Sequence, residues 1–159
     1  MERWGILNKK AAEEIIAQMD EQWGAHIEGD YQYLLTAKGR VYIVHKDVAK
    51  INFRALRIDA MGLYVAEIKK RQIRLSIEGS QLVGPKSTKN VVELDKETAI
   101  DWLRGADINV DDQAAGKQWS GFLIVKHGAD FLGSGKYVDG ALLNHVPKAR
   151  RLLTSDVSN

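Results

Sequence analysis

Residues 90–107 read NVVELDKETAIDWLRGAD and carry the strongest fold signals in the chain. Asn90 to Leu94 is rich in branched apolar side chains and predicts a short strand. Asp95 is a good helix N-cap, and Gly105 is a natural helix stop. Between them lies an apolar stripe at helical spacing, made of Ala99, Ile100, Trp102 and Leu103. The stretch therefore predicts a strand, a helix and a glycine turn, in that order.

Short apolar runs continue the chain beyond this stretch. They are Phe122 to Val125, Phe131 to Gly133 and Ala141 to Val146, separated by turn signals at Gly128, Gly135 and Gly140. Short strands with turns this close together are typical of a small β-barrel. The polar segment Asp111 to Gly116 is expected to be a loop.

The residues upstream combine helix and strand patterns. Residues 9–23 carry apolar side chains at helical spacing after the potential cap Asn8, which predicts an amphipathic helix. The other expected elements are a hairpin of Tyr31–Leu35 and Val41–His45, a short helix from Asp47 to Phe53, a strand from Gly62 to Ile68, and a strand in which Ile73, Leu75 and Ile77 alternate with polar residues.

A break at Gly84-Pro85-Lys86-Ser87 separates the two sets of patterns. We place a domain junction there, at roughly residues 80–89. The predicted fold class is α+β, with an N-terminal mixed α/β domain over residues 1–84 and a small β-barrel over residues 85–155. The length of 159 residues fits one domain or two small ones.

Composition and motifs exclude several classes of chemistry. The chain has no cysteine, which excludes disulfides, thiolate metal sites and a cysteine nucleophile. The four histidines lack metal-site spacing, there is no Gly-x-Ser-x-Gly, and the glycine-rich segment Gly128–Tyr137 fails the spacing of a phosphate-binding P-loop. We therefore expect no metal, no cofactor and no catalytic set. Neither a long apolar run nor a signal peptide is evident, so a cytoplasmic protein without a membrane partner is expected.

Charge is sorted along the chain although the net charge is only +2. Residues 1–37 and 90–112 are acidic, whereas residues 38–89 and 113–159 are basic. Such sorting favours a basic face that meets phosphates. The alternative is that the basic residues are solvated and pair with the acidic blocks. Charge alone does not decide between the two.

The second half resembles a PUA domain, a small RNA-binding barrel. Three segments carry the resemblance: the strand, helix and turn of residues 90–107, the hairpin containing Phe122–Val125 and Phe131–Gly135, and the basic segment Asn144–Leu152. They cover about residues 88–153, and their order and turn residues agree with the family. The resemblance implies that Asn144–Leu152 is the closing strand of the barrel.

The first half extends the resemblance through Gly62–Ile68 and Arg74–Pro85. These segments are similar to the region before the PUA domain in two families. One is a two-domain ribosome-biogenesis factor of eukaryotes and archaea. The other is the archaeal Sun-family RNA cytosine methyltransferases, whose activity needs a Rossmann domain for S-adenosylmethionine and catalytic cysteines. Because the chain lacks room for the former and has no cysteine, the resemblance implies an RNA-binding protein that is not an enzyme.

The resemblance also implies where RNA binds. In PUA domains RNA lies against the first helix, the following glycine turn and the closing strand, which here points to Arg104, Gly105, Ala106, Lys148, Arg150 and Arg151, with Lys126 and Lys136 on the central hairpin. Residues two apart in a strand share a face, so Lys148 and Arg150 are the expected pair. The alternative for this segment is a charged edge strand that discourages aggregation.

A second cluster of basic residues is a further candidate for phosphate contact, and a solvated turn explains it nearly as well. It comprises Lys69, Lys70, Arg71 and Arg74. Trp102 and Trp119 are candidates for base stacking, although Trp102 belongs to the apolar helical stripe and is expected to be buried.

Two functions remain. The first is a non-catalytic protein that binds structured rRNA or tRNA in ribosome biogenesis or RNA modification. The alternative is a protein–protein adaptor with weak RNA binding, whose acidic N-terminal helix docks an RNA methyltransferase or a pre-ribosomal protein. Acids near the glycine turn, at Asp101, Asp107, Asp111 and Asp112, argue against very tight RNA binding.

Overall fold

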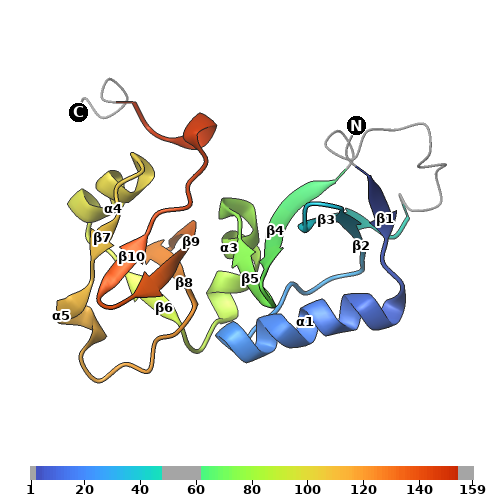
Figure 1. The fold of residues 1–159 in the computed structure, drawn as a ribbon, viewed down its shortest axis with the longest axis horizontal. Helices are drawn as coiled ribbons and strands as arrows, with labels where there is room; N and C mark the ends of the chain where they lie inside the picture. Colours follow the sequence, from blue (N-terminus) through green and yellow to red (C-terminus); the bar gives the residue numbers. More distant parts are fainter. Residues whose placement is uncertain (1–2, 48–61, 154–159) are drawn as a thin grey trace.

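A computed structural model describes residues 3–47 and 62–153, and it contains two five-stranded sheets with helices beside them (Figure 1). The first sheet comes from the N-terminal half and the second from the C-terminal half. The α+β class is therefore confirmed. The expected helix from Asp47 to Phe53 lies, beyond Asp47, outside the described residues.

The first sheet has the strand order β1-β2-β3-β4-β5, and each pair of neighbours is antiparallel. Its strands are β1 (Trp4–Ile6), β2 (Tyr31–Thr36), β3 (Arg40–His45), β4 (Leu63–Lys69) and β5 (Gln72–Leu75). Short turns join β2 to β3 and β4 to β5, whereas the chain runs through α1 between β1 and β2. The predicted hairpin and the strand at residues 62–68 are confirmed.

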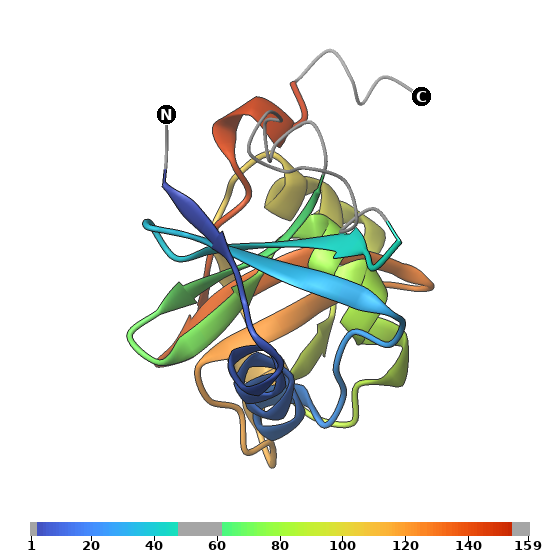
Figure 2. The same ribbon diagram turned by 90° about the vertical axis from the view of Figure 1, so that its right-hand side faces the viewer.

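Helix α1 (Lys9–Trp23) lies along one face of this sheet (Figure 2). Asn8 caps it by accepting a hydrogen bond from the Ala11 N–H at 2.8 Å. Ile15, Met19 and Trp23 recur every fourth residue and are buried against the sheet. The predicted amphipathic helix is confirmed.

The chain leaves the first sheet earlier than the sequence pattern predicts. β5 ends at Leu75, and α3 (Ile77–Val83) begins two residues later. Ser76 ends the strand because its hydroxyl caps the helix, accepting from the Gly79 N–H at 3.0 Å. The expectation that Ile77 continues the strand is therefore wrong. The 3₁₀ turn η3 (Gly84–Lys86) follows at the predicted break.

The second sheet has the order β6-β8-β9-β10-β7, in which only the β6–β8 pair is parallel. Its strands are β6 (Val91–Glu93), β7 (Ile108–Asn109), β8 (Phe122–His127), β9 (Asp130–Val138) and β10 (Ala141–Leu143). Helix α4 (Lys96–Leu103) follows β6, and Asp95 caps it by accepting from the Thr98 N–H at 2.8 Å. The predicted strand, helix and turn of residues 90–107 are confirmed.

Two expectations for this half are wrong. The segment from Asp111 is not wholly a loop, because α5 (Asp111–Ala114) forms one helical turn there. Lys148–Arg150 is not a closing strand but the 3₁₀ helix η4, which begins directly after Pro147. Proline has no N–H for a strand ladder and fixes its own φ, which explains the break from extended structure.

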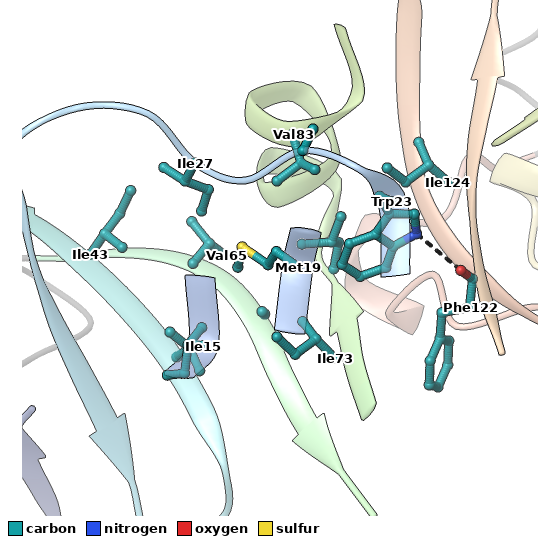
Figure 3. Close-up of a cluster of buried hydrophobic side chains, with 14 of the residues drawn as sticks. Ile15, Met19, Trp23, Ile27, Ile43, Val65, Ile73, Val83, Phe122 and Ile124 are labelled. Carbon is teal, nitrogen blue, oxygen red and sulfur yellow. Dashed lines mark hydrogen bonds between the residues drawn. The ribbon is translucent and has the colours of Figure 1, made fainter. Parts of the chain in front are cut away.

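The largest apolar core joins the two halves of the chain. It combines Ile15, Met19 and Trp23 of α1 with Phe122 and Ile124 of β8 (Figure 3). The Trp23 indole N–H donates to the Phe122 carbonyl at 3.0 Å, and both side chains are buried. A second core lies inside the C-terminal half around Trp102. The proposed boundary between residues 84 and 85 stays a prediction.

None of the described helices is long and apolar enough to span a membrane.

Candidate nucleic-acid interface

A groove of about 300 Å³ lies where the turn of the first sheet meets the second sheet. We call it the basic groove. Its lining combines four cationic side chains with a histidine, an amide and a phenyl ring. They are Lys69, Lys70, Arg74 and Lys136, then His145, Gln72 and Phe122. Residues more than sixty positions apart in the sequence thus meet in one concave site. Concave sites with convergent polar groups are the usual place for ligands.

A strained turn places the basic side chains at one end of this groove. Lys70 and Arg71 connect β4 to β5 and have φ values of 45° and 66°. Positive φ at both central residues is the pattern of a type I′ hairpin turn, which normally selects asparagine and glycine. Lys70 lines the basic groove, whereas Arg71 lines a separate groove beside Ile15 of α1. The four-residue cluster predicted from the sequence is therefore split.

A carboxylate behind the groove holds two of its cations. Glu67 pairs with the Arg74 guanidinium, and its other oxygen lies 3.2 Å from Lys69 Nζ. The Glu67 side chain is only 13% exposed, so it orients these cations rather than occupying the groove. Within residues 3–47 and 62–153, no carboxylate forms an ion pair with Lys70 or Lys136. The groove therefore keeps an excess of positive charge.

His145 completes the groove, although no motif in the sequence singles it out. Its Nδ1 lies 2.9 Å from Arg74 Nη1. Because a guanidinium only donates, Nδ1 must accept and the ring proton must sit on Nε2. Burial, followed by the positive charges of Arg74 and Lys69, lowers the pKa of His145 below its ordinary value of 6.5. The ring is also held edge-on to Phe122, with 5.8 Å between centroids.

A small pocket of about 60 Å³ extends the groove toward the C-terminal segment. It shares Arg74 and His145 with the basic groove and is also lined by Arg150. Arg150 Nη1 donates to Glu78 Oε1 of α3 at 2.6 Å. Lys148 is exposed on the same 3₁₀ helix. With about three residues per turn, residues two apart do not share a face, so the expected pairing of Lys148 with Arg150 is wrong.

The glycine turn and the C-terminal segment do come together. Gly105 has a φ of 100°, and a Cβ there would lie 2.6 Å from Arg151 Nε. Arg151 thus covers this turn, beside Arg104 and Ala106. The Gly105 and Ala106 N–H groups already donate to backbone carbonyls, both at 3.0 Å, so they are not available to a phosphate. Phosphate contact here would depend on the arginine side chains.

Lys126 lies elsewhere. Its Nζ is 3.7 Å from Glu93 Oε2 and 5.7 Å from the centroid of the Phe131 ring. It lines a different groove, beside Trp119. Of the twelve residues predicted from the sequence, the structure gathers four in the basic groove: Lys69, Lys70, Arg74 and Lys136. The other eight lie outside its lining: Arg71, Lys126, Arg104, Gly105, Ala106, Lys148, Arg150 and Arg151.

Comparison with known proteins identifies the C-terminal half. Residues 89–152 match the family described as the Methyltransferase RsmF PUA domain. The chain is 34% identical over 93 residues to the ribosomal RNA small subunit methyltransferase F of Aeromonas salmonicida, covering 58% of the chain and 19% of that protein. The methyltransferase of the same name from Vibrio cholerae is 26% identical over 139 residues, covering 87% of the chain and 28% of that protein.

These matches bear on one of the two families named from the sequence, the Sun-family RNA methyltransferases. The chain spans between 19% and 28% of the length of these two relatives. The relatives are methyltransferases of the Sun family, and they come from bacteria, so the archaeal association suggested by the sequence is not supported. Over residues 89–152, the chain therefore carries a PUA domain of the kind found in the RsmF ribosomal RNA methyltransferases.

Proposed function

We propose that this chain is a non-catalytic RNA-binding protein that holds structured rRNA or tRNA during ribosome biogenesis or RNA modification. The observation that carries the proposal is the basic groove, in which Lys69, Lys70, Arg74 and Lys136 surround a space of about 300 Å³. One carboxylate, Glu67, stands behind four cations, and clustered lysine and arginine in such excess attract a phosphate backbone. The names of the relatives, ribosomal RNA methyltransferases, favour rRNA as the ligand.

The groove needs both halves of the chain, which supports a joint role for the two predicted domains. Lys69, Lys70 and Arg74 come from residues 1–84, whereas Lys136 and His145 come from the PUA half. The Trp23–Phe122 hydrogen bond fixes the halves against each other. RNA would thus lie across the junction and read shape and phosphate positions, as proteins commonly read folded RNA.

Two observations favour a binding role without catalysis. The chain contains no cysteine to attack a base, and the part matched by a family model is the PUA domain of the methyltransferases. Acting beside an RNA methyltransferase or a pre-ribosomal protein is consistent with this role. The chain would then deliver or hold the RNA while its partner performs the chemistry.

The test is binding of tRNA and rRNA fragments to the full chain, measured by fluorescence anisotropy. Lys70→Ala/Lys136→Ala removes the two groove cations that form no ion pair with a carboxylate of the described residues. Lys10→Ala/Lys96→Ala removes the same charge from exposed helix positions that line none of the grooves described. We expect the first variant to lose most of the affinity and the second to keep it. Equal losses would contradict the proposal, and no binding by the wild-type chain would exclude it.

The adaptor function remains the second candidate because of one further groove. A space of about 400 Å³ lies between α1 and the first sheet, with an apolar lining that includes Leu7, Ile15, Leu35 and Ile73. Glu14 and Gln18 of α1 also line it. An apolar groove with a polar rim is suited to a protein segment. A wild-type chain that binds no RNA of the panel would favour this function.

A further inference from the structure

A third groove, of about 490 Å³, shares no lining residue with the basic groove. It lies between the segment that precedes β6 and the segment that precedes β8. We call it the tryptophan groove and define it by Lys89, Lys117, Trp119, Lys126 and Phe131. Its volume falls within the range of small-ligand sites, about 300–1,000 Å³.

Trp119 differs from the two tryptophans of the core. Trp23 and Trp102 are fully buried, and their indole N–H groups donate to backbone carbonyls at 3.0 and 2.9 Å. Trp119 is only partly buried, and none of the described residues accepts a hydrogen bond from its indole. An edge-on contact with Tyr137 holds the ring in place, with 77° between the ring planes and 5.7 Å between the centroids. The groove thus contains a fixed aromatic ring with an unused donor.

Cations accompany this ring. Lys89 and Lys117 are exposed, and no carboxylate of the described residues forms an ion pair with either. Lys126 is partly neutralised by Glu93, at 3.7 Å, and its ammonium lies over the Phe131 ring. The groove therefore offers positive charge beside a partly exposed aromatic surface.

This combination matches the two parts of a nucleotide. Lysines attract phosphate, and an aromatic side chain stacks on a base whose face is free. In an RNA duplex the base faces are stacked on one another, so stacking on a side chain selects unpaired nucleotides. A protein partner with acidic side chains could pair with the lysines and accept from the indole N–H, but its carboxylates would offer no flat face to stack on the ring.

We propose that the tryptophan groove binds an unpaired RNA segment, with a base stacked on Trp119 and phosphates held by Lys89 and Lys117. The inference deepens the proposed function, on which it rests for RNA as the ligand. The chain would then hold a folded RNA through the basic groove and a neighbouring single strand through the tryptophan groove.

The test uses a short oligouridine and, for comparison, an RNA hairpin with a fully paired stem and a tight loop, both titrated into the full chain. Tryptophan emission reports on stacking, and anisotropy reports on affinity. We expect oligouridine to quench the wild-type emission and to leave the emission of Trp119→Phe unchanged, while Trp4→Phe, the matched control, behaves as wild type. Trp119→Ala should weaken oligouridine binding about tenfold, or about 1.4 kcal/mol, and Trp119→Phe should keep most of the affinity.

The lysines give an independent readout. Lys89→Ala/Lys117→Ala should weaken oligouridine binding and spare the hairpin, whereas Lys70→Ala/Lys136→Ala should do the reverse. Equal quenching in wild type and Trp119→Phe would overturn the inference, as would polyglutamate competing as well as oligouridine. A hairpin that binds through the basic groove while oligouridine does not bind would refute this inference alone. Failure of both RNAs to bind would refute the proposed function as well.

Discussion

The strained turn between β4 and β5 allows stability and binding to be separated. Arg71 has a φ of 66°, a conformation that costs a residue with a side chain about 1–2 kcal/mol. Arg71→Gly removes this cost, but the greater conformational entropy of glycine stabilises the unfolded chain by about 0.4–1 kcal/mol. Taking the middle of each range, the net gain in the free energy of unfolding is about 0.8 kcal/mol. For a chain of this size that corresponds to an increase in Tm of about 1–4 °C.

The neighbouring position should respond differently in binding. Lys70→Asn suits a φ of 45° and should also stabilise the fold, but it removes a cation from the basic groove. Arg71→Gly removes a cation that lines another groove, so its loss of RNA affinity should be the smaller of the two. Urea unfolding with an unchanged m-value measures stability, and RNA titration at fixed salt measures binding. A destabilised Arg71→Gly, or an affinity loss as large as that of Lys70→Asn, would refute this reasoning.

Three further predictions concern the fold. Trp23→Phe should lower the free energy of unfolding in urea by about 2–4 kcal/mol, because it leaves the Phe122 carbonyl unpaired and opens a cavity. The unfolding transition should stay single, and two separate transitions would contradict a core shared by both halves. Gly105→Ala should lower the free energy of unfolding by about 1–2 kcal/mol, because φ is 100° and Arg151 occupies the space of a Cβ. Gly5→Ala, which has open space around the new Cβ, should change stability little, and equal effects of the two substitutions would contradict this reasoning. The pKa of His145 is lower in the folded chain than in the unfolded one, so the unfolded chain binds more protons as the pH falls below about 6.5 and stability should decrease there. His145→Gln should reduce this loss of stability, and an unchanged slope of stability against pH would exclude His145 as its source.

Local signals were sufficient for much of the fold. Asn8 and Asp95 mark the starts of α1 and α4 because a side-chain cap acts within three residues of itself. Alternation alone was insufficient after β5, where Ile77 fits a strand pattern and yet begins a helix. There the cap from Ser76 prevails over the period-two pattern.

The candidate site was predictable only in pieces. The sequence shows that Lys69, Lys70 and Arg74 are basic, but it does not show that Lys136 and His145 reach the same groove, since that depends on how two sheets pack. Adjacent residues in the turn, Lys70 and Arg71, diverge into separate grooves because of their backbone dihedrals. The pairing of Lys148 with Arg150 failed because it assumed a strand where Pro147 starts a 3₁₀ helix.

The salt dependence of RNA binding shows whether the lysines of the basic groove contact phosphates. Each phosphate neutralised by a lysine contributes about 0.7–0.9 to the slope of log K against log salt concentration. If Lys70 and Lys136 contact phosphates, Lys70→Ala/Lys136→Ala should reduce the slope by about 1.4–1.8 relative to wild type. Lys10→Ala/Lys96→Ala should leave it unchanged. A slope that is unchanged in the groove variant, or equally reduced in both, would contradict RNA binding in the basic groove.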